Sequence, residues 1–193
     1  MTRFNAQNRV DATLISNLRI MRRTLINQIS KRCDKSKEII TGVVHALLSR
    51  SIFIKYLEER KDSNGETVFP QDFYCNFMES AKRYTDVLNS KEATYNLFRI
   101  LKDKFNGDTL QVSEIETEII TQDDLNELRT FILGDSELES RQLTLWPIYS
   151  FDIIPIQLIS SIYELFFHLS DEEDEKGTYY TPLHLVNLVM DEV

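Results

Sequence analysis

The sequence has few glycines and prolines, and its glycines are widely scattered. Five glycines and four prolines in 193 residues are too few for the many tight turns of a β-sandwich or a β-barrel. The glycines stand singly, at positions 42, 65, 107, 134 and 177. No phosphate-binding loop, dinucleotide fingerprint or methyl-donor fingerprint fits that spacing. The chain therefore lacks the loops on which a complete small enzyme of these classes depends.

Signatures of metal chemistry and of nucleophilic catalysis are also missing. Cys33 and Cys75 form no Cys-x-x-Cys pair, so we expect reduced thiols. His45, His168 and His184 show no ligand spacing with cysteines or carboxylates, and no Gly-x-Ser-x-Gly marks a nucleophile. His45 falls within an apolar helical face, which favours a packed core histidine over a catalyst.

Long apolar runs are absent as well. No run approaches the roughly 18 to 20 residues of a membrane span, and the N-terminus lacks the apolar core of a signal peptide. The sequence therefore predicts a cytoplasmic protein with no membrane partner.

Charge is distributed unevenly along the chain. Residues 1–60 hold 12 Lys and Arg against 5 Asp and Glu, a net of +7, whereas residues 61–193 hold 10 against 26, a net of −16. A basic face attracts a polyanion such as DNA. The alternative is that long helices simply expose their Lys and Arg side chains to water, and charge by itself favours that reading.

The basic part of the sequence predicts two long amphipathic helices. The first runs from about residue 11 to 32, with an apolar stripe formed by Val10, Leu14, Leu18, Met21, Leu25 and Ile29. Basic residues on its other faces are candidates for contact with DNA phosphates: Arg19, Arg22, Arg23, Lys31 and Arg32. Ser36 is suited to cap the second helix, which extends to about Arg60 with a broad apolar surface.

The remainder of the chain also reads as mostly helical. Residues 61–66 form a turn cluster, and helices are predicted over about 71–88, from Ser90 to 105, from about Thr121 to Gly134, within 146–169 and from Pro182 onward. Residues 108–121 fit a short strand or a helical turn equally well. We therefore expect an all-α bundle of about six to eight helices, with a helical domain over 1–169 followed by an acidic loop and a first further helix over 170–193.

The end of the second predicted helix carries Glu58, Glu59 and Arg60. These charges are read first as a solvated helix end. A salt bridge buried within the bundle is the alternative.

Three segments resemble the region that precedes the catalytic domain of N6-adenine DNA methyltransferases of restriction-modification systems, as methylase subunits or fused restriction-methylase chains. Residues 45–60 are similar to that family's helix ending in a "FLEDR"-like sequence, and residues 151–164 are similar to a second part of that region. Residues 177–182 resemble its "G-x-Y/F-Y/F-T-P" element. Residues 61–145 match nothing of the family.

The resemblance implies that Tyr180, Thr181 and Pro182, with Tyr179 beside them, support binding of S-adenosylmethionine in the parent enzyme. The family's Gly-rich donor loop and its "N/D-P-P-Y/F" motif for the flipped adenine are missing from this sequence. The chain thus resembles an N-terminal helical module truncated just after the Thr-Pro element. We expect such a module to be catalytically incompetent alone and not to bind the donor tightly.

Its implied partners are DNA, the downstream methyltransferase domain, and specificity or restriction subunits. The alternative is a protein-interaction adaptor with no nucleic-acid contact, which the acidic composition of residues 61–193 favours.

Overall fold

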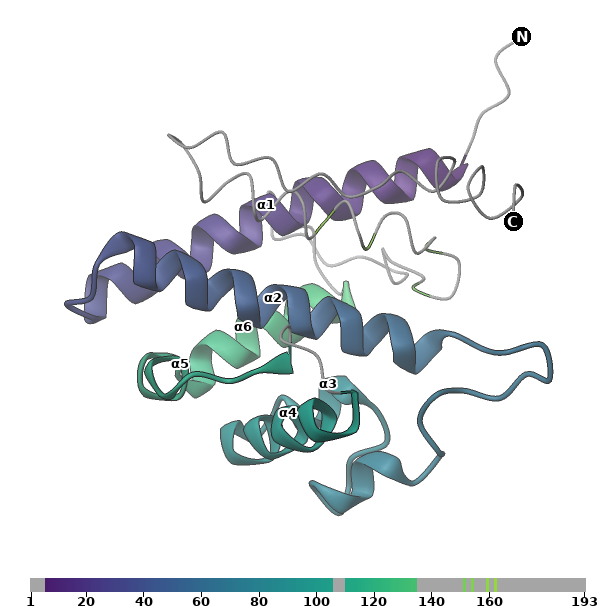
Figure 1. The fold of residues 1–193 in the computed structure, drawn as a ribbon. Helices are drawn as coiled ribbons and strands as arrows, with labels where there is room; N and C mark the ends of the chain where they lie inside the picture. The colour runs from purple at the N-terminus through teal and green to yellow at the C-terminus, as the bar shows by residue number, and fades with distance from the viewer. Residues whose placement is uncertain are drawn as a thin grey trace, which may run out of the picture. The chain divides into compact units, whose positions relative to one another are not determined.

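A computed structural model describes residues 6–105 and 110–134, together with Phe151, Ile154, Ile159 and Ile162; side chains are described from Thr13 onward. The chain divides into two compact units, Met1–Ile154 and Pro155–Val193. In the second unit only Ile159 and Ile162 are described, and both are helical and buried. The first unit is built from helices, which confirms the predicted all-α class (Figure 1).

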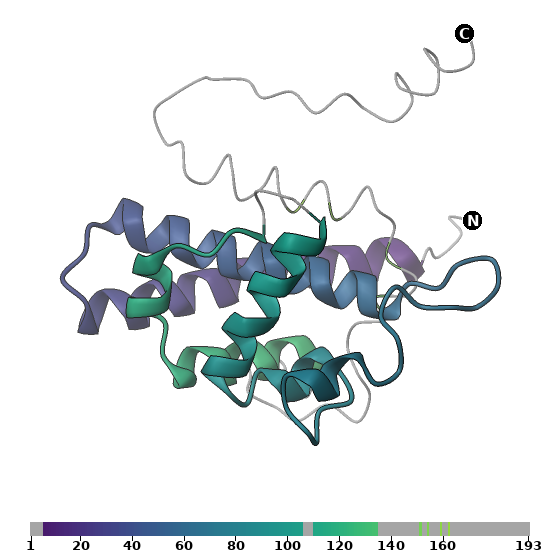
Figure 2. The same cartoon turned by 60° about the horizontal axis from the view of Figure 1, so that its bottom comes forward.

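Helices α1 (Ala6–Arg32) and α2 (Lys37–Glu59) form an antiparallel hairpin, and α2 lies between α1 and the shorter helices α3 and α4 (Figures 1 and 2). The predicted stripe of α1 is buried from Leu14 onward, since Leu14, Leu18, Met21, Leu25 and Ile29 are at most 1% exposed; the Val10 side chain lies outside the described part of the chain. At the start of α2 the Ser36 side chain accepts a hydrogen bond from the Ile39 N–H. The predicted cap is confirmed.

Helix α2 is the core helix of this unit. Its apolar residues Ile40, Val44, Leu47, Leu48 and Ile52 are at most 1% exposed. By length and composition α2 is the one helix among the described residues that is apolar enough to cross a membrane. Most of it is buried within the folded unit, and a core position accounts for the same composition.

Between α2 and α4 the structure corrects the sequence prediction. One helix over 71–88 is wrong: the chain forms a 3-10 turn, η1 (Phe73–Asn76), and a single turn, α3 (Tyr84–Val87). Two carboxylates accept hydrogen bonds from backbone N–H groups in this stretch. Asp86 accepts one from Lys82, and Glu58 accepts one from Tyr84. Such side-chain hydrogen bonds compete with those of a continuous helix.

The preceding turn cluster is confirmed. The Asp62 carboxylate accepts hydrogen bonds from the N–H groups of Asn64 and Glu66, and these bonds lower the pKa of Asp62. Gly65 adopts a positive φ of 83° within this turn.

The remaining helices are α4 (Lys91–Phe105), α5 (Glu114–Ile119) and α6 (Gln122–Leu133), and α6 contacts α1. The Ser90 hydroxyl accepts a hydrogen bond from the Ala93 N–H, as predicted. For residues 108–121 the sequence fitted a strand or a helical turn equally well, and the structure shows the short helix α5 there. Helix α6 begins after Thr121 and ends at Gly134, as predicted. Thr121 and Asp124 form a capping box, and Gly134 adopts the left-handed conformation.

Several predictions lie outside the described residues. They are the Asn106-Gly107 stop, nearly all of the helix within 146–169, the acidic run at 171–175 and the last helix from Pro182.

Candidate nucleic-acid interface and the charges that support it

One face of α1 is exposed, basic and free of acidic residues. Its exposed side chains recur at helical spacing: Ser16, Arg19, Arg23, Asn27 and Ser30, with Lys31 beside them. No Asp or Glu occurs between Asp11 and Asp34. Among the described residues, the side chains of Arg19, Arg23 and Lys31 have no hydrogen bond or ion pair. We call Arg19, Arg23 and Lys31, with the polar residues between them, the α1 stripe.

Arg22 lies at the edge of this face and contacts α2. Its Nε donates a hydrogen bond of 2.5 Å to Nε2 of His45, and both side chains are half-buried. Burial and the nearby guanidinium lower the pKa of His45 to about 4, so this imidazole is neutral at physiological pH. His45 is therefore packed between helices, as predicted.

Arg32 also has partners inside the fold. Its guanidinium pairs with the buried carboxylate of Asp124, and Nη2 donates to the Ile119 carbonyl at 3.2 Å. The same Asp124 oxygen accepts from the N–H and hydroxyl of Thr121. Arg32 thus connects the end of α1 to the start of α6. Because Arg22 and Arg32 have partners inside the fold, three of the five predicted phosphate contacts remain in the α1 stripe: Arg19, Arg23 and Lys31.

A buried ion pair between α2 and α5 was not predicted from the sequence. Arg50 of α2 is 0% exposed and Glu116 of α5 is 1% exposed, with Nη1 and Oε1 2.7 Å apart. Nη2 also donates to the Gln111 carbonyl at 2.7 Å, and the guanidinium lies 4.6 Å from the Phe98 ring centroid. The available signal was position: Arg50 lies on the apolar surface of α2, between Leu47 and Ile54, where a charge requires a partner.

Hydroxyl groups surround this pair. The hydroxyls of Ser51 and Tyr84 are 2.8 Å apart, and Ser51 Oγ also donates to the Leu47 carbonyl. Burial raises the pKa of both Tyr84 and Tyr95. These phenols stay protonated, which suits a structural network better than acid–base catalysis.

The charged end of α2 is engaged in the fold. Lys55 Nζ lies 2.5 Å from Glu58 Oε2 and 2.6 Å from Glu59 Oε1. Burial opposes the charge on Lys55, but the two carboxylates outweigh it and raise its pKa. The structure therefore shows the alternative predicted for Glu58 and Glu59, a salt bridge within the bundle. Arg60 is exposed and lies beside the Tyr56 ring.

No family model, curated protein or solved structure matches the chain. Function is therefore inferred from the residues and their geometry.

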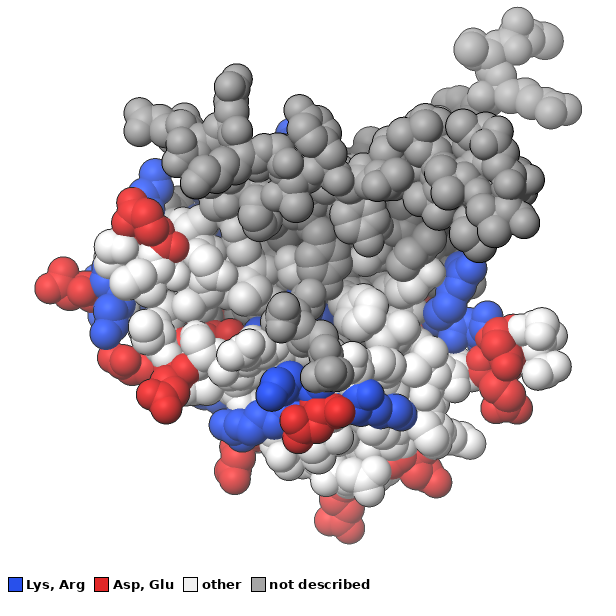
Figure 3. Space-filling view, in the orientation of Figure 1, with Lys and Arg blue, Asp and Glu red and all other residues white. Residues whose placement is uncertain are grey.

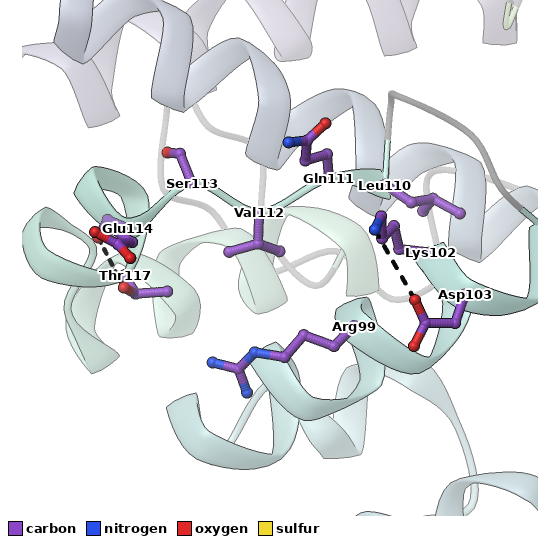
Figure 4. Close-up of a pocket in the computed structure, with 9 residues that line it drawn as sticks. All are labelled: Arg99, Lys102, Asp103, Leu110, Gln111, Val112, Ser113, Glu114 and Thr117. Carbon is purple, nitrogen blue, oxygen red and sulfur yellow. Dashed lines mark hydrogen bonds and ion pairs between the residues drawn. The ribbon is translucent and has the colours of Figure 1, made fainter.

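A second basic surface lies over α4, where a row of Lys and Arg surrounds an acidic side chain (Figure 3). A hollow of about 390 Å³ opens there, between α4 and residues 110–117 (Figure 4). Its lining mixes charges of both signs: Arg99 and Lys102 face it together with Asp103 and Glu114. Such a lining selects no single class of ligand.

The described residues contain no set that fits a methyl donor. Gly42 lies within α2, Gly65 in a turn and Gly134 at a helix end, so none belongs to a Gly-rich loop. Within the same residues no group of three His, Cys, Asp or Glu is placed to hold a metal ion. Tyr179, Tyr180, Thr181 and Pro182 lie outside the described part of the chain.

Proposed function

We propose that this chain is the N-terminal helical module of an S-adenosylmethionine-dependent adenine-N6 DNA methyltransferase of a restriction-modification or phage-defence system. In this proposal the module holds duplex DNA by its phosphates and supports the catalytic domain and partner subunits. The methyl donor and the Thr-Pro element belong to the proposal through the sequence resemblance, and no chemical step is assigned to the described residues.

The α1 stripe is the observation that carries the DNA-binding part. Arg19 and Lys31 are separated by about 18 Å of helix axis at about 1.5 Å per residue, a length over which duplex DNA carries on the order of ten phosphate charges. The stripe offers cationic, hydroxyl and amide donors, the groups that contact phosphate oxygens. Because no carboxylate interrupts it, nothing on this face repels a polyanion.

The supporting role is favoured by α2. This helix carries the segment 45–60 that resembles the methyltransferase family, and its charged residues are used within the fold: Arg50 pairs with Glu116 and Lys55 with Glu58 and Glu59. A core helix that fixes surrounding elements is suited to hold a neighbouring domain. Arg50 and Lys55 are correspondingly unavailable for contact with DNA.

The test is binding of a short DNA duplex by the chain and by an Arg19→Gln/Arg23→Gln/Lys31→Gln variant at low salt. We expect the triple variant to lose about tenfold or more in affinity, since each phosphate contact contributes to binding. A matched variant, Lys37→Gln/Lys61→Gln/Lys82→Gln, removes the same charge from exposed sites elsewhere and should bind nearly as well as the unchanged chain. Equal losses in both variants would show that net charge, and not the stripe, governs binding.

A protein-interaction adaptor is the second candidate, favoured by apolar residues exposed on α4. Ile100 is 44% and Phe105 37% exposed, beside Arg99 and Lys102. An adaptor should bind no duplex even at low salt and need not associate with a separately supplied methyltransferase domain, whereas the proposed module should associate with it. Size-exclusion chromatography of the mixture separates the two readings.

A further inference from the structure

Two adjacent carboxylates at the end of α2 hold backbone N–H groups from distant parts of the chain. Glu58 Oε1 accepts a hydrogen bond of 2.5 Å from the Tyr84 N–H. Glu59 Oε2 accepts one of 2.9 Å from the Phe151 N–H, 92 residues away in sequence. The end of α2 is thus a junction for the first turn of α3 and for the chain at Phe151.

One ammonium group joins the two carboxylates. Lys55 Nζ contacts Glu58 through Oε2 and Glu59 through Oε1, so in each glutamate one oxygen faces Lys55 and the other accepts the backbone bond. The side chains of Lys55 and Glu58 are 11% and 12% exposed, and Glu59 is 32% exposed. Reduced contact with water strengthens such charge-assisted bonds.

The Phe151 side chain is buried as well, at 1% exposed. A buried ring and a charge-assisted backbone bond hold the same residue at two points. That combination fixes both the position and the orientation of the chain there.

We infer that Glu59 is a positioning residue that fixes the chain at Phe151, and that Lys55 couples this contact to the one between Glu58 and Tyr84. The contact itself does not depend on the proposed function, but its biological role does, because Phe151 begins the second segment that resembles the methyltransferase family. Lys55, Glu58 and Glu59 then hold the first residue of that segment at the end of α2.

The experiment is amide hydrogen exchange in the full chain, followed by NMR with ¹⁵N-phenylalanine and ¹⁵N-tyrosine labels. In Glu59→Ala we expect exchange at Phe151 to rise about tenfold or more, because a bond to a charged acceptor is lost, with a smaller change at Tyr84. Glu59→Gln keeps an acceptor oxygen and should show an intermediate rise. Lys55→Met should raise exchange at both amides, whereas the exposed control Glu66→Ala should change neither.

The inference is overturned if Phe151 exchanges at the same rate in Glu59→Ala as in the unchanged chain. If Glu59→Ala loosens the whole fold, the labelled amides of α2, Phe53 and Tyr56, will exchange faster too, and Glu59→Gln then decides. A rise at Phe151 that exceeds the rise in α2 supports the positioning role, and a uniform or absent rise contradicts it. DNA takes no part in this readout, so the positioning role and the proposed function can fail separately.

Discussion

At the scale of single residues, Arg50 and Glu116 form the most buried ion pair among the described residues. Both side chains are removed from water, and each charge is tolerable only because the other is present. Arg50 also binds a backbone carbonyl and lies over an aromatic ring. This residue therefore fixes α2 against α5 and against α4.

Replacing Arg50 by Met should lower the free energy of unfolding by about 3–5 kcal/mol, because Glu116 is left as an uncompensated buried charge. The double variant Arg50→Met/Glu116→Met removes both charges and should be more stable than Arg50→Met alone. Urea denaturation gives both values. Arg83→Met removes an exposed arginine from its ion pair with a half-buried Asp86; it is the control and should change stability by less than about 1 kcal/mol. A double variant no more stable than Arg50→Met would contradict the paired-charge explanation.

His45 gives a residue-level prediction about pH. Its pKa is about 4 in the folded chain and about 6.5 when unfolded, so between these values the unfolded chain binds a proton that the folded chain does not. Stability should therefore fall as pH decreases from about 6.5 to about 4. His45→Gln keeps an acceptor for Arg22 without that titration, and its stability should fall less over this window. Superimposable pH profiles from denaturation at each pH would refute this assignment.

At the scale of elements, turn chemistry and periodicity predicted most of the described helices. The one helix that was predicted wrongly, over 71–88, lies where a long-range contact changes the backbone hydrogen bonding. The stripe of α1, the Ser36 cap and the Thr121 and Gly134 ends of α6 are local patterns, and the structure confirms them. The helix predicted over 71–88 fails because the Glu58 carboxylate, from another element, takes the Tyr84 N–H. No local pattern reveals a partner 26 residues away.

Two glycines allow the backbone itself to be tested. An added Cβ meets nothing within 4 Å at either Gly42 or Gly65, but Gly65 has a φ of +83° and Gly42 lies within α2. We expect Gly42→Ala to raise stability by about 0.5–1 kcal/mol, because alanine favours a helix, and Gly65→Ala to lower it by about 1 kcal/mol. Thermal denaturation of the two variants measures the contrast. Equal effects would mean that the assigned backbone conformations are wrong.

At the scale of the whole molecule, the charge asymmetry in the sequence overstates the basic surface. Of the basic residues in 1–60, Arg50 and Lys55 are buried, and Arg22 and Arg32 have partners inside the fold. Composition could not separate these from Arg19, Arg23 and Lys31, because only tertiary packing shows which cations are already paired. The predicted DNA-binding surface is therefore limited to the α1 stripe.

The most direct test of this account is the salt dependence of DNA binding by the chain and by the triple variant that lacks the α1 stripe cations. Each phosphate contact contributes about −0.9 to the slope of log K against log[salt]. Between about 50 and about 200 mM salt, replacing Arg19, Arg23 and Lys31 by Gln should therefore make the slope shallower by about 2–3 units. An unchanged slope, or no duplex binding by the unchanged chain at the lowest salt, would contradict the assignment of this helix as the DNA-contacting surface.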